Sequence, residues 1–101
     1  MAFKARADNV REQIRLILTA WGMSDDLAET TAHVMTETDL IGVDSHGISM
    51  LMTYERKRGE NRFDFTAKPT IVRENAVAAL MDAGGNLGHP VSVAAMQLAI
   101  K

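Results

Sequence analysis

The stretch "TIVRENAVAALMDA", residues 70–83, decides the fold class that the sequence predicts. It opens with three β-branched residues, reaches the polar pair Glu74 and Asn75, and continues into a second apolar run. β-Branched residues favour strands, and a polar pair between two apolar runs is typical of a hairpin. Pro69 prevents a helix from running into the stretch, although the alanines of the second run favour helix. We therefore predict a two-stranded β-hairpin in a chain whose other elements are helical.

Three helices are predicted before this hairpin. The first covers residues 5–21 and ends before Gly22, because its apolar positions recur at steps of three and four residues. The second follows Ser24, whose side-chain oxygen is expected to cap it. The third is expected to run from about Ser45 to Gly59. The apolar positions of the first helix are Val10, Ile14, Ile17, Leu18 and Trp21.

A loop and a fourth helix are predicted after the hairpin. The loop is "GGNLGHP", residues 84–90, whose glycines are expected to adopt positive backbone angles, and Pro90 suits the first turn of a helix. We expect the helix to be incomplete and the chain to be truncated at Lys101, since no residue that ends helices precedes it. The predicted class is α+β, with a helical region at 1–62 and the hairpin and helix start at 63–101. The expected buried stripe of the last helix is Val93, Met96, Leu98 and Ile100.

Composition limits the classes of function. The chain has 101 residues, 47% hydrophobic and 24% charged, which is ordinary for one globular domain. A formal net charge of -2 gives no general attraction to nucleic acid, and no apolar run is long enough to cross a membrane. The absence of cysteine excludes disulfides and thiolate metal sites and fits a reducing compartment. We expect a cytoplasmic protein that binds neither nucleic acid nor a membrane.

The motif "DSHG", Asp44 to Gly47, has two interpretations. In the first, Asp44 or Ser45 caps the third helix and His46 lies in its first turn, facing solvent. In the second, His46 exchanges a proton with a substrate, because histidine is the side chain that titrates near neutral pH. Ser45 could then orient the imidazole ring or relay a proton. The motif by itself leaves both interpretations open.

The other histidines and the second glycine-rich stretch are predicted to be structural. "GGNLGH" has neither the spacing of a dinucleotide-binding loop nor that of a Walker loop, and no lysine follows it. His89 is therefore expected to be a loop residue. His33 has no second histidine one helical turn away, where a helical metal site needs one. We predict no metal site.

Taken in order, these segments resemble the malate/L-lactate dehydrogenase family, the NAD(P)-dependent 2-hydroxyacid oxidoreductases that lack the Rossmann fold. The resemblance covers essentially the whole chain. The segments that carry it are "WGMSDDLAETTAHVMTETDLIGVDSHGISML", "YERKRGENR" and "PTIVRENAVAALMDAGGNLGHPVSVAAMQLAIK".

This resemblance implies the role of each motif residue. His46 would be the proton donor to the substrate carbonyl, with Ser45 as its hydrogen-bonding or relay partner. Many family members have an arginine four residues after the histidine, where it binds the substrate carboxylate; this chain has Met50. The resemblance further implies a longer parent enzyme, a small 2-oxo or 2-hydroxy acid substrate, NAD or NADP as cofactor, and a homodimer. The segments that bind the cofactor would lie outside these residues, so the chain alone is expected to be inactive.

Two other classes of protein remain as alternatives. The first is a non-catalytic helical interaction module in which His46 is only a surface residue. An intact three-helix unit with a closed core would favour it, whereas an exposed apolar face on the last helix would favour the enzyme part. The second is a helical DNA-binding domain, which the apolar third helix and the negative charge disfavour.

Overall fold

The computed structural model describes residues 4–101 as four α-helices and one two-stranded sheet. This arrangement confirms the predicted α+β class. The elements are α1 (Ala7–Ala20), α2 (Asp25–Leu40), the short 3₁₀ turn η1 (Asp44–His46), α3 (Met50–Gly59), β1 (Thr70–Glu74), β2 (Ala79–Asp82) and α4 (Gly88–Ile100). No helix in residues 4–101 is both long enough and apolar enough to cross a lipid bilayer.

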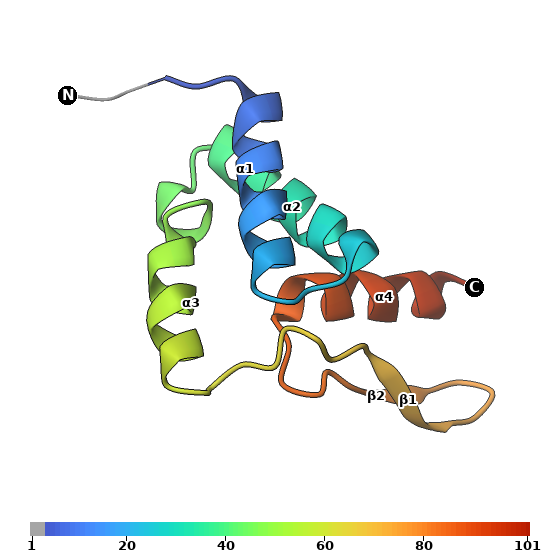
Figure 1. Cartoon of the computed structure of the whole chain (residues 1–101). Coiled ribbons are helices and arrows are strands. Elements are labelled where there is room, and N and C mark those ends of the chain that lie inside the picture. The colour runs from blue at the N-terminus through green and yellow to red at the C-terminus, as the bar shows by residue number, and fades with distance from the viewer. Residues whose placement is uncertain (1–3) are drawn as a thin grey trace.

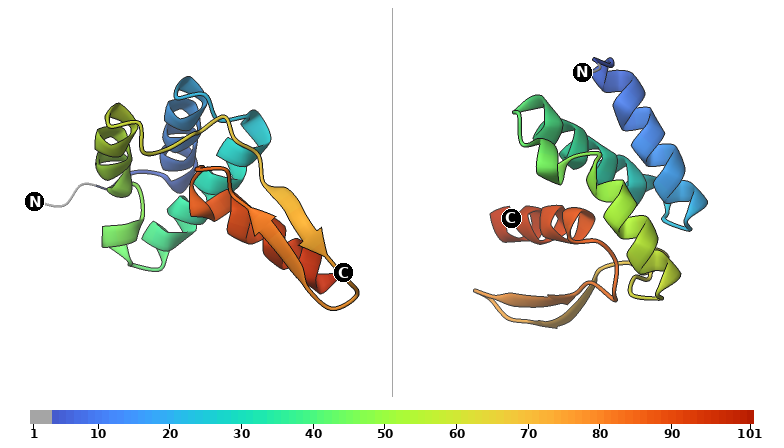
Figure 2. Two further views of the ribbon diagram at one scale, coloured as in Figure 1. Left: turned by 90° about the horizontal axis from the view of Figure 1, so that it is seen from below. Right: turned by 90° about the vertical axis from the view of Figure 1, so that its left-hand side faces the viewer.

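The helices form the body of the molecule and the hairpin extends from one end of it (Figure 1). Helices α1 and α2 pack against each other, and α3 lies beside them. Helix α4 packs against α2 and separates the hairpin from the other helices, as the second view of Figure 2 shows. The hairpin therefore lies on the far side of α4 from the three-helix body.

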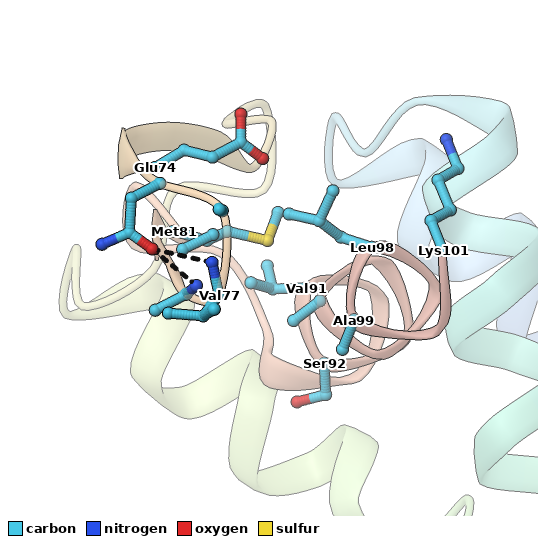
Figure 3. A pocket seen from close by; sticks show the side chains of 13 residues that line it. Glu74, Val77, Met81, Val91, Ser92, Leu98, Ala99 and Lys101 are labelled. Atoms are coloured by element: carbon cyan, nitrogen blue, oxygen red, sulfur yellow. Dashed lines mark hydrogen bonds between the residues drawn. The ribbon is translucent and has the colours of Figure 1, made fainter.

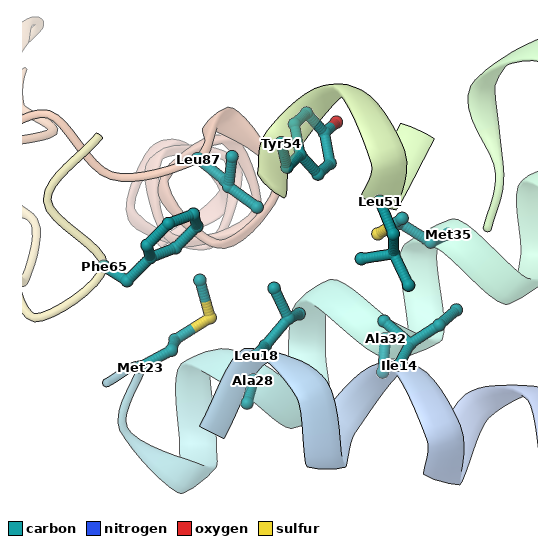
Figure 4. Packing of buried hydrophobic residues seen from close by; sticks show 10 residues of the cluster. All are labelled: Ile14, Leu18, Met23, Ala28, Ala32, Met35, Leu51, Tyr54, Phe65 and Leu87. Carbon is teal, nitrogen blue, oxygen red and sulfur yellow. The ribbon is translucent and has the colours of Figure 1, made fainter. Parts of the chain in front are cut away.

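One hydrophobic core joins the three N-terminal helices to the segments on both sides of the hairpin (Figure 4). Small residues of α2 let α1 approach closely, and the larger side chains of α1 fill the space above them. Residues from both predicted regions, 1–62 and 63–101, contribute to this core. Its members are Ile14, Leu18, Met23, Ala28, Ala32, Met35, Leu51, Tyr54, Phe65 and Leu87.

Helix ends agree with the sequence prediction at α1 and differ at the next two helices. Gly22 has φ of +105° directly after α1, as a glycine that ends a helix should. Ser24 occupies the N-cap position of α2, but its side chain makes no capping hydrogen bond: its hydroxyl donates instead to Asp26 Oδ1 at 2.7 Å. The third helix begins at Met50 and not at Ser45, so that prediction was wrong. The motif forms a separate 3₁₀ turn because the chain is held to the end of α2 before α3 begins.

The hairpin confirms the strand prediction, whereas the predicted stripe of the last helix is partly wrong. Strands β1 and β2 pair antiparallel with an irregularity between Ile71 and Arg73. On α4, the side chains of Met96 and Ile100 are 62% and 75% exposed, while Val93 and Leu98 are half-buried. The periodicity of α4 predicted a helix correctly, but it could not show which face α2 would cover.

Candidate active site

The loop between α2 and α3 carries the "DSHG" motif and is tied to the end of α2 by backbone hydrogen bonds (Figure 1). The amide of Gly42 donates to the carbonyl of Asp39 and that of Val43 to the carbonyl of Thr38, each at 3.0 Å. Gly42 has φ of +88°, a backbone conformation that favours glycine and lets the chain reverse here. The motif therefore begins from a fixed point on α2.

Ser45 and His46 are brought together within this motif. The hydroxyl oxygen of Ser45 lies 2.7 Å from Nδ1 of His46, and both side chains are exposed. When Nδ1 carries a proton and donates it to the hydroxyl oxygen, Nε2 of the neutral imidazole keeps a free lone pair and is the nitrogen left to face a reactant. The pair can thus hold one ring nitrogen while the other gives or takes a proton.

The backbone that follows His46 is fixed by a side chain of α2. Oδ2 of Asp39 accepts a hydrogen bond of 2.9 Å from the amide of Ile48. A Cβ placed on Gly47 would collide with the carboxylate of the same Asp39, so a side chain at position 47 would require that carboxylate to move. The sequence analysis did not identify Asp39. The sequence pattern gives no signal for Asp39, because the burial and the negative φ of Gly47, which indicate close approach of another group, are visible only in the structure.

Met50 is the first residue of α3, four positions after His46. Its side chain is half-buried and packs against the hydrophobic core. Among the cations of the following segment, Arg58 forms an ion pair with Glu55 at 2.8 Å and lies 5.4 Å from the ring centre of Trp21. Position 50, where the resemblance implies an arginine in many relatives, therefore carries no cation in this chain.

Side chains of the loop before α4 accept hydrogen bonds from two of its backbone amides. The amide of Gly84 donates to Oδ1 of Asp82, and the amide of Leu87 donates to the side-chain oxygen of Asn86. Gly84 and Gly85 have φ of +68° and +93°, as predicted for this loop. The amides of Gly84 and Leu87 are therefore engaged within the loop and are not free to bind a phosphate in this conformation.

His89 lies in the first turn of α4 and not in the loop where we had expected it. Its ring meets Tyr54 edge-on with 6.2 Å between ring centres, and its Nδ1 has no hydrogen-bond partner in residues 4–101. Burial lowers the pKa of His89 below the ordinary histidine value and raises the pKa of Tyr54. Within the described part of the chain, no group of three His, Cys, Asp or Glu side chains could hold a metal ion.

The structure has a hollow whose lining does not include the motif (Figure 3). It has a volume of about 600 Å³ and lies between the hairpin and α4, with Glu74, Met81, Val91 and Leu98 on its walls. None of its lining residues belongs to the segment 41–50. Because the acid-base pair lies elsewhere, we place the candidate site at Ser45 and His46 and not at this hollow.

The sequence matches the malate/L-lactate dehydrogenase family over residues 5–101. The chain belongs to this family. It is 31% identical to the L-sulfolactate dehydrogenase of Methanocaldococcus jannaschii over 96 residues, which are 95% of this chain and 28% of that protein. It is 33% identical to the malate dehydrogenase of Pyrococcus horikoshii over 85 residues, 84% of this chain and 24% of that protein.

The fold of this family member agrees with solved structures of the same family. The crystal structure of malate dehydrogenase from Entamoeba histolytica superposes with a TM-score of 0.92 at 27% identity, covering 99% of this chain and 28% of that one. The chain thus spans about a quarter of the length of the relatives it matches.

Proposed function

We propose that this chain supplies the acid-base group of a nicotinamide-dependent 2-hydroxyacid dehydrogenase. The observation that carries the proposal is the 2.7 Å contact between Ser45 Oγ and His46 Nδ1 on a turn that is fixed to α2. Family membership over residues 5–101 supplies the class of reaction. Without the family match, the pair of Ser45 and His46 would indicate only a histidine on a surface turn.

His46 handles the proton of the reaction. During reduction of a 2-oxo acid, the imidazolium gives its Nε2 proton to the substrate carbonyl oxygen and becomes neutral. During oxidation of a 2-hydroxy acid, neutral Nε2 takes the hydroxyl proton. Ser45 holds Nδ1 and so keeps Nε2 directed at the reactant. The bound nicotinamide, NAD or NADP, supplies or accepts the hydride.

Met50 is proposed to contact the substrate at the place where many relatives have arginine. A thioether cannot balance a carboxylate, which needs a cation or several amide donors when water is removed. We infer that Met50 lies beside the carboxylate of a small 2-oxo or 2-hydroxy acid without balancing its charge, and that another residue of the complete enzyme supplies the cation or the amide donors. Relatives of this chain carry the names sulfolactate, malate and L-lactate dehydrogenase.

The central test replaces His46 in the complete enzyme. His46→Ala should lower kcat by roughly 10² to 10⁴, the usual contribution of a general acid. Oxidation of NADH and of NADPH would be followed with a panel of small 2-oxo acids. His33→Ala is the matched control, because His33 is exposed on α2 and lies outside the motif. Unchanged turnover of His46→Ala across the panel would contradict the proposal.

The remaining expectations belong to the same proposal. We expect the 101-residue chain alone to show no NADH or NADPH oxidation, because it spans only about a quarter of the length of the relatives it matches. We also expect the complete enzyme to be a cytoplasmic homodimer. Light scattering would measure its molar mass and so test the dimer. No comparison supports the alternative of a non-catalytic interaction module, and the exposed Met96 and Ile100 on α4 are the feature that favoured the enzyme part over it.

A further inference from the structure

The structure points to Asp39 as a positioning residue for His46, an inference that rests on the proposed function. Asp39 lies in the last turn of α2 and is half-buried. Its carboxylate is not hydrogen-bonded to the imidazole of His46. It contacts Gly47 and Ile48, the two residues that follow His46. Oδ2 accepts the Ile48 amide at 2.9 Å, and the carboxylate occupies the space where a side chain on Gly47 would lie.

These two contacts fix the turn from its C-terminal side. Before the motif, the Val43 amide is bonded to the carbonyl of Thr38 on α2. After it, the Ile48 amide is bonded to Asp39, also on α2. The 3₁₀ turn that carries His46 is therefore held at both ends by the same helix. A carboxylate accepts this bond more strongly than a neutral oxygen, and none of the ion pairs in residues 4–101 engages Asp39 in competition.

The catalytic consequence concerns placement of the ring. Ser45 controls the rotation of the imidazole through Nδ1, whereas Asp39 controls where the backbone of His46 lies. A displacement of about 1 Å in an acid-base group can cost roughly 10²-fold in rate. Without Asp39, the Gly47–Ile48 backbone loses its link to α2, and His46 moves with it. The loss should fall on kcat, because His46 acts in the chemical step.

Two variants of Asp39 in the complete enzyme separate positioning from charge. Asp39→Ala should lower kcat by about 10- to 100-fold with a much smaller change in KM. Asp39→Asn keeps an oxygen acceptor for the Ile48 amide and removes the charge. It should keep kcat within a few-fold of wild type and leave the pH profile of kcat unchanged. Wild-type kcat in Asp39→Ala, or an equal loss and a shifted pH profile in Asp39→Asn, would overturn the inference.

The contact between Asp39 and Gly47 provides a second, independent test. Gly47→Ala should reduce both thermal stability and kcat, because its methyl group meets the carboxylate. In the double variant Asp39→Ala with Gly47→Ala, the space left by the carboxylate admits the methyl group. Stability should then exceed that of Gly47→Ala, while kcat stays as low as in Asp39→Ala. If the stability losses of the two single variants simply add, the two sites are not in contact and the inference fails.

NMR distinguishes failure of this inference from failure of the proposed function. The ring signals of His46 should change in Asp39→Ala and stay near wild type in Asp39→Asn, whether or not the enzyme reduces 2-oxo acids. If His46→Ala is fully active while the signals behave in this way, the proposed function fails and the positioning role stands. If the His46 signals are the same in Asp39→Ala and wild type, the positioning role is wrong whatever the activity.

Discussion

The pair of Ser45 and His46 is the smallest unit on which the proposed chemistry depends. Its geometry comes from adjacent residues in a 3₁₀ turn, so it needs little support from distant parts of the chain. Both side chains are exposed. In an exposed pair, the hydroxyl must compete with water for the ring nitrogen, and its contribution is correspondingly modest.

Removing the Ser45 hydroxyl should therefore have a smaller effect than removing His46. Ser45→Ala in the complete enzyme should lower kcat by about tenfold, equivalent to one hydrogen bond of about 1.4 kcal/mol. Ser45→Thr keeps the hydroxyl and should recover most of the activity. Ser92→Ala, an exposed serine on α4, serves as the control. An unaffected kcat in Ser45→Ala, measured under saturating substrate, would remove Ser45 from the mechanism.

Met50 offers a test of how the substrate carboxylate is bound. Met50→Arg places a cation four residues after His46, and its aliphatic stem can keep part of the packing of methionine. It should increase kcat/KM for small 2-oxo acids by roughly tenfold or more, since hydrogen bonds to charged groups contribute about 1.5–3 kcal/mol. Met50→Leu is the uncharged control. Equal kcat/KM values for the two variants would show that position 50 does not face the carboxylate.

At the scale of elements, the strand-to-helix loop is held by one buried amide. The side-chain nitrogen of Asn86 donates to the carbonyls of Phe65 and Ala67 at 3.3 and 2.8 Å, and its oxygen accepts the Leu87 amide at 2.7 Å. Asn86 therefore joins the segment before β1 to the start of α4. These bonds satisfy backbone groups that are buried and cannot form hydrogen bonds with water.

Asn86→Ala should destabilise the protein by about 1–3 kcal/mol, because it leaves buried backbone groups without partners. Urea unfolding would measure the change. Asn9→Ala, at an exposed position of α1, is the control and should alter stability by less than about 0.5 kcal/mol. Should both variants unfold at the same urea concentration, the loop would owe its conformation to its glycines and not to Asn86.

At the scale of the whole molecule, His89 makes the stability of the protein depend on pH through its contact with Tyr54 of α3. The ring of His89 lies against Tyr54, and burial holds its pKa below the ordinary histidine value. The unfolded chain therefore binds this proton more readily than the folded protein does. The contribution to stability is complete above the unfolded pKa of about 6.5 and is lost as the pH falls toward the folded pKa.

Thermal unfolding should consequently show a lower Tm at pH 5.5 than at pH 7.5. His89→Gln should reduce this difference, because glutamine does not titrate in that range, whereas the exposed control His33→Gln should keep it. The carboxylates whose pKa values are lowered, Glu12, Asp26, Glu55 and Asp64, lose their stabilising charge only at more acidic pH. The same pH dependence in His89→Gln and wild type would place its origin elsewhere.

The sequence by itself determined the elements and the order in which they occur. The periodicity of α1, Gly22 at its end, and the change of pattern at Pro69 are local signals, and each predicted its element correctly. It also identified Ser45 and His46 as adjacent residues with complementary chemistry, and the structure places them in contact. Local signals suffice here because secondary structure and neighbour contacts depend on residues close in the chain.

Only the tertiary structure decided where α3 begins, which face of α4 is covered, and what fixes the histidine turn. Asp39 and Ile48 are nine residues apart, and the contact forms because the chain reverses after α2. Met96 and Ile100 are as apolar as Val93 and Leu98, yet α2 packs on one side of α4 and leaves Met96 and Ile100 exposed. These outcomes depend on which surfaces meet when helices pack, and packing is set by the whole chain, not by any one segment.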